Sequence, residues 1–103
     1  MTHNTAPLLQ SIEAKRDELV ALTQDLVRIP TINPPGDAYE ACAHLIGERL
    51  ARKGFAVEYV RAIGAPGDSD SHPRTNVVAR WQAPKPGECV HFNSHIDVVE
   101  AGP

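Results

Sequence analysis

The chain has 103 residues, enough for one domain, and 10 lysines and arginines against 13 aspartates and glutamates give a formal net charge of −3. This mild acidity argues against nucleic acid and anionic membranes as partners. Aromatic residues make up only 5% of the sequence, so any core has to be aliphatic. No stretch reaches the roughly 20 apolar residues that cross a bilayer, and the first residues lack the pattern of a secretory signal.

The two cysteines indicate the redox state of the cellular compartment in which the protein works. Cys42 and Cys89 stand alone, without CxxC spacing, and we interpret both as small buried apolar residues. A chain without a disulfide framework is typical of a reducing compartment, so we expect a cytoplasmic protein.

The first helix is predicted over residues 8–29, where apolar side chains recur at helical spacing. Pro30 ends it, because the residue before a proline avoids the α region. The segment TINPPG, residues 31–36, should then be extended, since its two prolines fix φ and remove two backbone donors.

The second helix is predicted over about residues 38–53. Asp37 is the expected N-cap, with Glu40 in the capping-box position, and Gly54 is the expected residue after the last turn. The apolar stripe of this helix comprises Cys42, Leu45, Ile46 and Leu50.

Three strands are predicted next, so the order is helix, helix, strand, strand, strand. The extended patterns cover residues 55–63, 76–81 and 89–99, with turn-rich segments between them, and the last of them is either a strand or a strand that runs into a loop. Two helices on three strands can cover one face of a sheet, whereas the other face stays open unless more chain packs there. We therefore expect residues 1–103 to be a piece of a larger α/β domain.

The most informative stretch is VHFNSHIDVV, residues 90–99. Successive side chains of a strand point to opposite faces, so one face of this stretch is mostly apolar. The other face carries a row of polar side chains: His91, Asn93, His95 and Asp97. Burying this row costs free energy unless each group finds a partner, and a metal or catalytic site is one way to provide it.

His95 and Asp97 have Cα atoms roughly 6.6 Å apart if the chain is extended. Either both side chains bind one cation, or His95 binds it and Asp97 accepts a hydrogen bond from the other imidazole nitrogen, which fixes the tautomer. His91 is about 13 Å from His95 and too far away to join the same ion. The spacing by itself is more typical of a hydrogen-bonded strand histidine beside an aspartate that caps the next element.

The segment FNSHIDVVEAG, residues 92–102, resembles the first metal-site motif of the dinuclear-zinc deacylase and peptidase family. That family includes acetylornithine deacetylase, succinyl-diaminopimelate desuccinylase, aminoacylase and zinc carboxypeptidases of the same fold. The similarity extends to DLVRIPTINPPG at 25–36, GFAVE at 54–58 and TNVVAR at 75–80. Glu100 stands where the family usually has proline. The NPPG loop and the HIDVV form are most similar to the acetylornithine deacetylase and desuccinylase branch.

The resemblance implies an α/β fold, namely the amino-terminal part of a three-layer αβα catalytic domain. The rest of that domain and a lid or dimerisation domain would lie outside residues 1–103. It implies that His95 is a ligand of one of two Zn²⁺ ions, for which Co²⁺ can substitute, and that Asp97 is the catalytic aspartate that orients the site. The substrate would be an N-acyl amino acid or a peptide, and the parent enzyme a homodimer.

The resemblance also implies that this chain is incomplete as a catalyst. Zinc sites use at least three protein ligands, and the family's bridging aspartate, paired glutamates and later ligands follow the first motif. We expect that the isolated chain neither binds zinc tightly nor catalyses amide hydrolysis. The alternative hypothesis is a noncatalytic interaction or scaffold module, or a pseudogene remnant, of the same fold. The coding sequence beyond Pro103 would distinguish the two.

Overall fold

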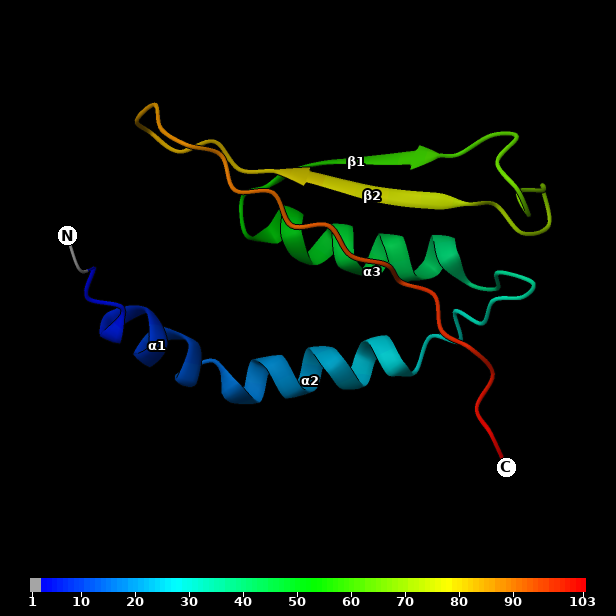
Figure 1. Ribbon diagram of the computed structural model, residues 1–103, viewed down its shortest axis with the longest axis horizontal. Coiled ribbons are helices and arrows are strands. Elements are labelled where there is room, and N and C mark those ends of the chain that lie inside the picture. Colours follow the sequence, from blue (N-terminus) through cyan, green and yellow to red (C-terminus); the bar gives the residue numbers. More distant parts are fainter. Residues whose placement is uncertain (1–2) are drawn as a thin grey trace.

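The computed structural model describes residues 3–103, and within them the chain forms three helices and two strands (Figure 1). The helices are α1 (Ala6–Glu13), α2 (Arg16–Val27) and α3 (Tyr39–Arg52), and the strands are β1 (Ala56–Arg61) and β2 (Thr75–Arg80). The predicted α/β class is confirmed. The first predicted helix is divided in two, and the third predicted strand has no ladder.

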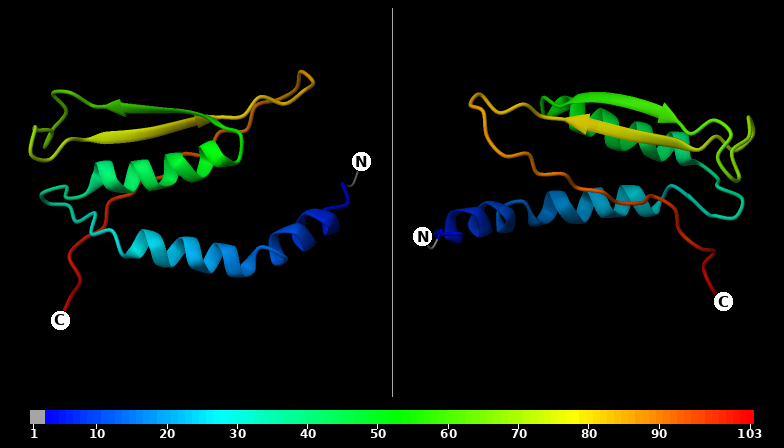
Figure 2. Two further views of the ribbon diagram at one scale, coloured as in Figure 1. Left: turned by 180° about the vertical axis from the view of Figure 1, so that it is seen from behind. Right: turned by 45° about the horizontal axis from the view of Figure 1, so that its top comes forward.

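The helix predicted over residues 8–29 is interrupted at Ala14 and Lys15. The Lys15 N–H donates to the carbonyl of Ile12 at 3.0 Å, so the last turn of α1 tightens and α2 starts in a new direction (Figure 2). Much of the apolar stripe predicted for this region is exposed: Leu8, Leu9, Ile12, Leu19, Val20 and Val27. Within residues 3–103, no helix combines the length and the apolar character needed to span a bilayer.

Helix α3 packs beneath the antiparallel pair of β1 and β2 and contributes most of the small core (Figure 1). Its buried residues are Tyr39, Cys42, Ala43 and Gly47. Tyr59 of β1 stacks on His44 with ring centroids 4.0 Å apart, and a Cβ at Gly47 would lie 2.7 Å from the Tyr59 Cζ. Val60 and Val78, on the other face of the strands, are exposed. That face is open, as the sequence predicted.

The predicted capping box at the start of α3 is wrong. The N-cap is Ala38, with a left-handed φ of 56°, and no side chain caps the helix. The Asp37 carboxylate instead lies 3.1 Å from Nε2 of His72, in the loop between the strands. Glu40 accepts a hydrogen bond from Thr75 at 3.5 Å. Both carboxylates therefore contact residues that are distant in sequence instead of capping the helix.

The segment TINPPG is extended only at its start, which corrects the prediction for residues 31–36. The backbone N–H groups of Gly36 and Asp37 both donate to the carbonyl of Ile32, at 2.8 and 3.0 Å, so the chain turns after Ile32. Gly36 has a φ of +100°, which a residue with a side chain rarely adopts.

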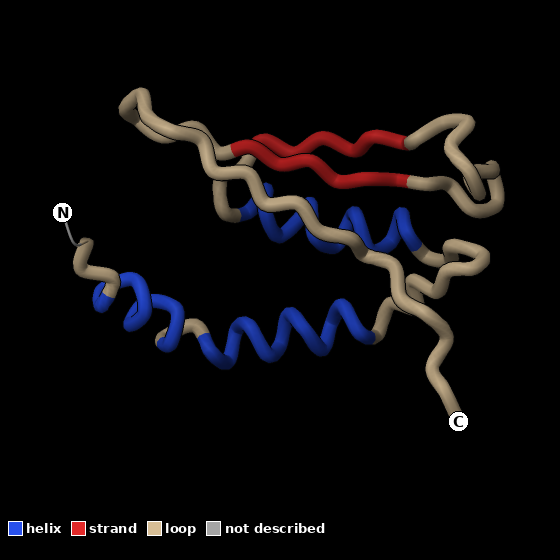
Figure 3. The backbone as a smooth tube through the Cα atoms, viewed as in Figure 1, coloured by secondary structure: helices blue, strands red, loops and turns tan. Residues whose placement is uncertain are grey.

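Residues 89–99, predicted as the third strand, run back across the molecule without a strand ladder (Figure 3). The one isolated bridge described for this segment pairs Val98 with Ile32 in parallel. Val90, Phe92 and Val99 are highly exposed. An alternating apolar pattern predicts a strand, but a ladder also needs a neighbour in register, and β1 and β2 pair with each other instead.

The two cysteines differ in their surroundings. Cys42 is buried on α3, and burial raises the pKa of its thiol. Cys89 lies on the exposed segment after β2, so the prediction that both thiols are buried is wrong for this one.

The loop between β1 and β2 is organised by Asp68, whose side chain is only 4% exposed. Arg61 donates to both carboxylate oxygens at 3.0 and 3.1 Å, and the backbone N–H groups of Arg74 and Gly64 donate at 2.9 and 3.3 Å. The hydrogen bond from Arg61, followed by that from Arg74, lowers the pKa of Asp68 from 3.8 to about 2.

Replacing Asp68 with asparagine should destabilise the fold in a pH-dependent way. A carboxyl whose pKa is lowered by folding stabilises the native state in full above its unfolded value of 3.8, and this contribution is lost as the pH falls through about 2. The difference in free energy of unfolding between wild type and Asp68→Asn should therefore be largest near neutral pH and shrink in acid. Urea unfolding followed by circular dichroism measures it.

Asp70→Asn is the matched control, because Asp70 also accepts from Arg61, at 3.1 Å, but from a fully exposed position. Surface ion pairs contribute little, so this variant should stay close to wild type at every pH. Equal losses for the two variants would contradict the role assigned to Asp68.

Candidate functional site

The segment with the predicted site residues is anchored to the loop after α2 by three hydrogen bonds. The Thr31 hydroxyl donates to the Ile96 carbonyl at 2.6 Å. The Val98 N–H donates to the Thr31 carbonyl and the Asn33 N–H to the Val98 carbonyl, each at 2.9 Å. Thr31 is 3% exposed, so its hydroxyl bond is shielded from water. We call this set of three bonds the 31–33 clamp.

His95 and Asp97 are in direct contact just at the start of this anchored stretch. Nδ1 of His95 lies 2.8 Å from Oδ1 of Asp97 and 3.0 Å from its backbone carbonyl oxygen. The His95 side chain is 84% exposed. The Asp97 carboxylate therefore contacts one ring nitrogen of His95, Nδ1, as in the second arrangement that the spacing allowed.

The second oxygen of the Asp97 carboxylate contacts a residue that the sequence analysis did not place in the site. The Asn33 amide Nδ2 donates to Oδ2 at 3.3 Å. This bond, followed by the one with His95, lowers the pKa of Asp97, so the carboxyl is ionised at neutral pH. The only sequence signal for Asn33 was its place in the TINPPG segment, which is similar to a loop of the deacylase and peptidase family.

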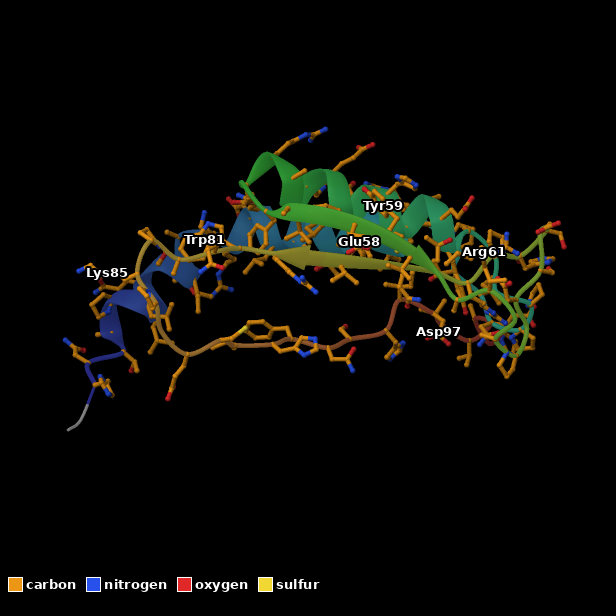
Figure 4. All side chains as sticks on the ribbon, turned by 90° about the horizontal axis from the view of Figure 1, so that it is seen from above. Glu58, Tyr59, Arg61, Trp81, Lys85 and Asp97 are labelled. Atoms are coloured by element: carbon orange, nitrogen blue, oxygen red, sulfur yellow. The ribbon has the colours of Figure 1, made fainter. Side chains whose placement is uncertain are left out.

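An open cleft of about 370 Å³ lies beside this pair. Its walls come from α3, the β1–β2 loop, the start of β2 and the extended segment after β2. They include Tyr39, Arg74, Thr75, Ser94, His95 and Asp97. The cleft is at the end of the hairpin that carries Arg61, away from Trp81 and Lys85, as the position of Asp97 in Figure 4 shows. Its volume suits a small molecule.

The structure brings together two of the four polar residues predicted on one face of this stretch. His91 and Asn93 are exposed, whereas Asp97 is partly buried against Asn33. No group of three or more histidine, cysteine, aspartate or glutamate side chains within residues 3–103 is arranged to hold a metal ion. At this cleft the described residues therefore offer one imidazole, that of His95, with the Asp97 carboxylate beside it.

The structure is thus an α/β chain with an exposed histidine–aspartate pair at a small cleft. No family model and no solved structure match the sequence. The chain is 35% identical over 82 residues to succinyl-diaminopimelate desuccinylase of Halorhodospira halophila, which is 80% of this chain and 18% of that protein. It is 36% identical over 84 residues to succinyl-diaminopimelate desuccinylase of Dinoroseobacter shibae, which is 81% of this chain and 19% of that protein.

These similarities confirm the resemblance predicted from the sequence. Over about four-fifths of its length the chain is similar to proteins named succinyl-diaminopimelate desuccinylases. It spans about a fifth of the length of the curated relatives it matches.

Thr31→Val should weaken the 31–33 clamp without changing the shape of the side chain. Loss of a buried hydrogen bond that leaves the Ile96 carbonyl without its donor should cost about 1–2 kcal/mol of the free energy of unfolding. Amide hydrogen exchange at Val98 should accelerate at the same time. Urea unfolding and exchange monitored by NMR provide the two measurements.

Thr23→Val is the matched control, because the Thr23 hydroxyl also donates to a backbone carbonyl, that of Leu19, at 2.8 Å. This bond is exposed on α2, where water can replace it, so the variant should have a much smaller effect. Similar losses in the free energy of unfolding for the two variants would show that the Thr31 hydrogen bond contributes no more to stability than an exposed one.

Proposed function

We propose that this chain supplies the first metal-binding motif of a metal-dependent amide hydrolase, a deacylase of N-acyl amino acids or a peptidase. The observation that carries the proposal is the exposed His95 ring with the Asp97 carboxylate 2.8 Å from its Nδ1. The similarity to proteins named desuccinylases, which are hydrolases, supports the reaction class. We further propose that the substrate is a small N-acyl amino acid or a peptide, that the parent enzyme is a homodimer, and that it works in the cytoplasm.

Nε2 of His95 is the proposed ligand atom. Metal-binding histidines ordinarily donate their other ring N–H to a carboxylate or carbonyl, which orients the ring and raises the basicity of the ligating nitrogen. Asp97 is in that position, on Nδ1, and its lowered pKa keeps it ionised as an acceptor. An imidazole suits Zn²⁺ and Co²⁺ alike.

If two Zn²⁺ ions were bound with His95 as one ligand, they would supply Lewis-acid chemistry, polarising an amide carbonyl and lowering the pKa of a bound water toward neutrality. Zinc sites use at least three protein ligands. No group of three such side chains within residues 3–103 is arranged to hold a metal ion, so His95 can fill only one ligand position. We therefore propose that residues 1–103 are the amino-terminal portion of a catalytic domain whose other ligands and general base lie elsewhere, and that the chain alone is inactive.

Titration of the isolated chain with Zn²⁺ should show weak binding confined to His95. A complete structural zinc site provides about 10–16 kcal/mol, and a single imidazole should provide far less. The ring ¹⁵N resonances of His95 should move on titration, and the response should disappear in His95→Ala. His91→Ala, which removes an exposed histidine on the same segment, is the control and should keep it. A tight stoichiometric complex would contradict the expectation of an incomplete site.

A chimera tests the reaction. In this chimera the chain replaces the segment of the Halorhodospira halophila desuccinylase that it matches. The chimera should hydrolyse succinyl-diaminopimelate. Asp97→Asn should lower the rate roughly 10–100-fold, the usual effect of losing the group that orients a metal-bound histidine, and His95→Ala should lower it further. His91→Ala should leave the rate unchanged. An active chimera that tolerates His95→Ala would contradict the proposed function.

A further inference from the structure

Four side chains from three separate parts of the chain form a connected row that ends at His95. Nη2 of Arg74, just before β2, donates to Oδ1 of Asn33 at 3.4 Å. Nδ2 of Asn33 donates to Oδ2 of Asp97 at 3.3 Å, and Oδ1 of Asp97 lies 2.8 Å from Nδ1 of His95. The row connects the loop before α3 and the β1–β2 loop to the imidazole.

The chemistry of its neighbours determines which way the Asn33 amide points. A guanidinium only donates hydrogen bonds, and an ionised carboxylate only accepts them. Reversing the amide would place its oxygen against the Asp97 carboxylate and its NH₂ group against the Arg74 guanidinium, so both contacts would become repulsive. Asn33 can therefore serve both neighbours only in the orientation observed.

Arg74 is itself held in place by close packing. Its guanidinium carbon lies 5.0 Å from the centre of the Tyr39 ring, a cation–π distance. Gly36 and Gly67 also approach the guanidinium so closely that a Cβ at either position would overlap it. The group that orients Asn33 is thus confined by packing on several sides.

We propose that Asn33 is a positioning residue, which holds the Asp97 carboxylate so that one oxygen is presented to Nδ1 of His95. With Oδ2 engaged by Asn33, the carboxylate cannot turn that oxygen toward the ring or toward a cation without losing a hydrogen bond. Oδ1 then keeps the proton of the neutral ring on Nδ1 and leaves the lone pair on Nε2. The inference rests on the proposed function only in giving Nε2 its role as ligand.

The ring tautomer of His95 tests the inference in the absence of metal. Long-range ¹H–¹⁵N spectra of the labelled chain, recorded at a pH where the ring is neutral, should show the proton on Nδ1 in the wild type. Asn33→Leu removes the donor, and Asn33→Asp places a second carboxylate beside Asp97. In each variant the ratio of the Nδ1–H to the Nε2–H form should fall roughly two- to tenfold, as expected for a weakened hydrogen bond.

Asn93→Leu is the matched control, because Asn93 is exposed two residues before His95 and should leave the ratio unchanged. Arg74→Gln, which removes the guanidinium that orients the amide, should lower the ratio by a smaller factor. The backbone amide spectrum of each variant establishes that the fold is retained, and Asn33→Asp keeps the size of the native side chain if Asn33→Leu does not fold.

Asn33 variants that retain the fold and the wild-type tautomer would overturn the positioning role, whether or not His95 binds Zn²⁺. A Zn²⁺ titration without any response at His95 would instead overturn the proposed function and leave the tautomer result intact. The two failures are therefore distinguishable.

Discussion

The position of the site depends on the 31–33 clamp. The stretch that carries His95 has no strand ladder, so the bonds from Thr31 and Asn33 to residues 96–98 decide where it lies relative to α3. The residues joined are 65 positions apart at the Thr31–Ile96 bond, and ordering such a long connection has an entropic cost that these bonds offset. Asn33 contributes its backbone to the clamp and its side chain to Asp97, so anchor and site are one unit.

Packing elsewhere in the molecule is sparse. The core is formed mainly by α3 against β1 and β2, with Tyr39, Cys42 and Ala43 buried. Large apolar side chains on α1, α2 and the extended segment remain in contact with solvent. A chain of this size that buries so little apolar surface has little free energy to offset its conformational entropy. This is the packing expected if residues 1–103 form a portion of a larger domain, as we propose.

The chemistry of the pair follows from how the carboxylate is shared. Asn33 and His95 each engage one oxygen of Asp97, and both interactions favour its ionised form. The ionised carboxylate in turn selects the ring nitrogen that carries the proton. An exposed imidazole thereby acquires a defined tautomer and a defined direction for its lone pair, which a histidine on an extended segment would otherwise lack.

Features that depend on neighbouring residues followed from the sequence alone. The span of α3, the glycine with a φ of 91° that follows its last turn, the positions of the two strands and the contact between His95 and Asp97 all reflect side-chain periodicity or spacings of a few residues. The missing capping box, the absent ladder of residues 89–99 and the place of Asn33 were decided by the tertiary structure. Each depends on partners far apart in the chain, such as Asp37 with His72 or Asn33 with Asp97. Local patterns state which conformation a segment prefers, but only the folded chain determines which distant group it meets.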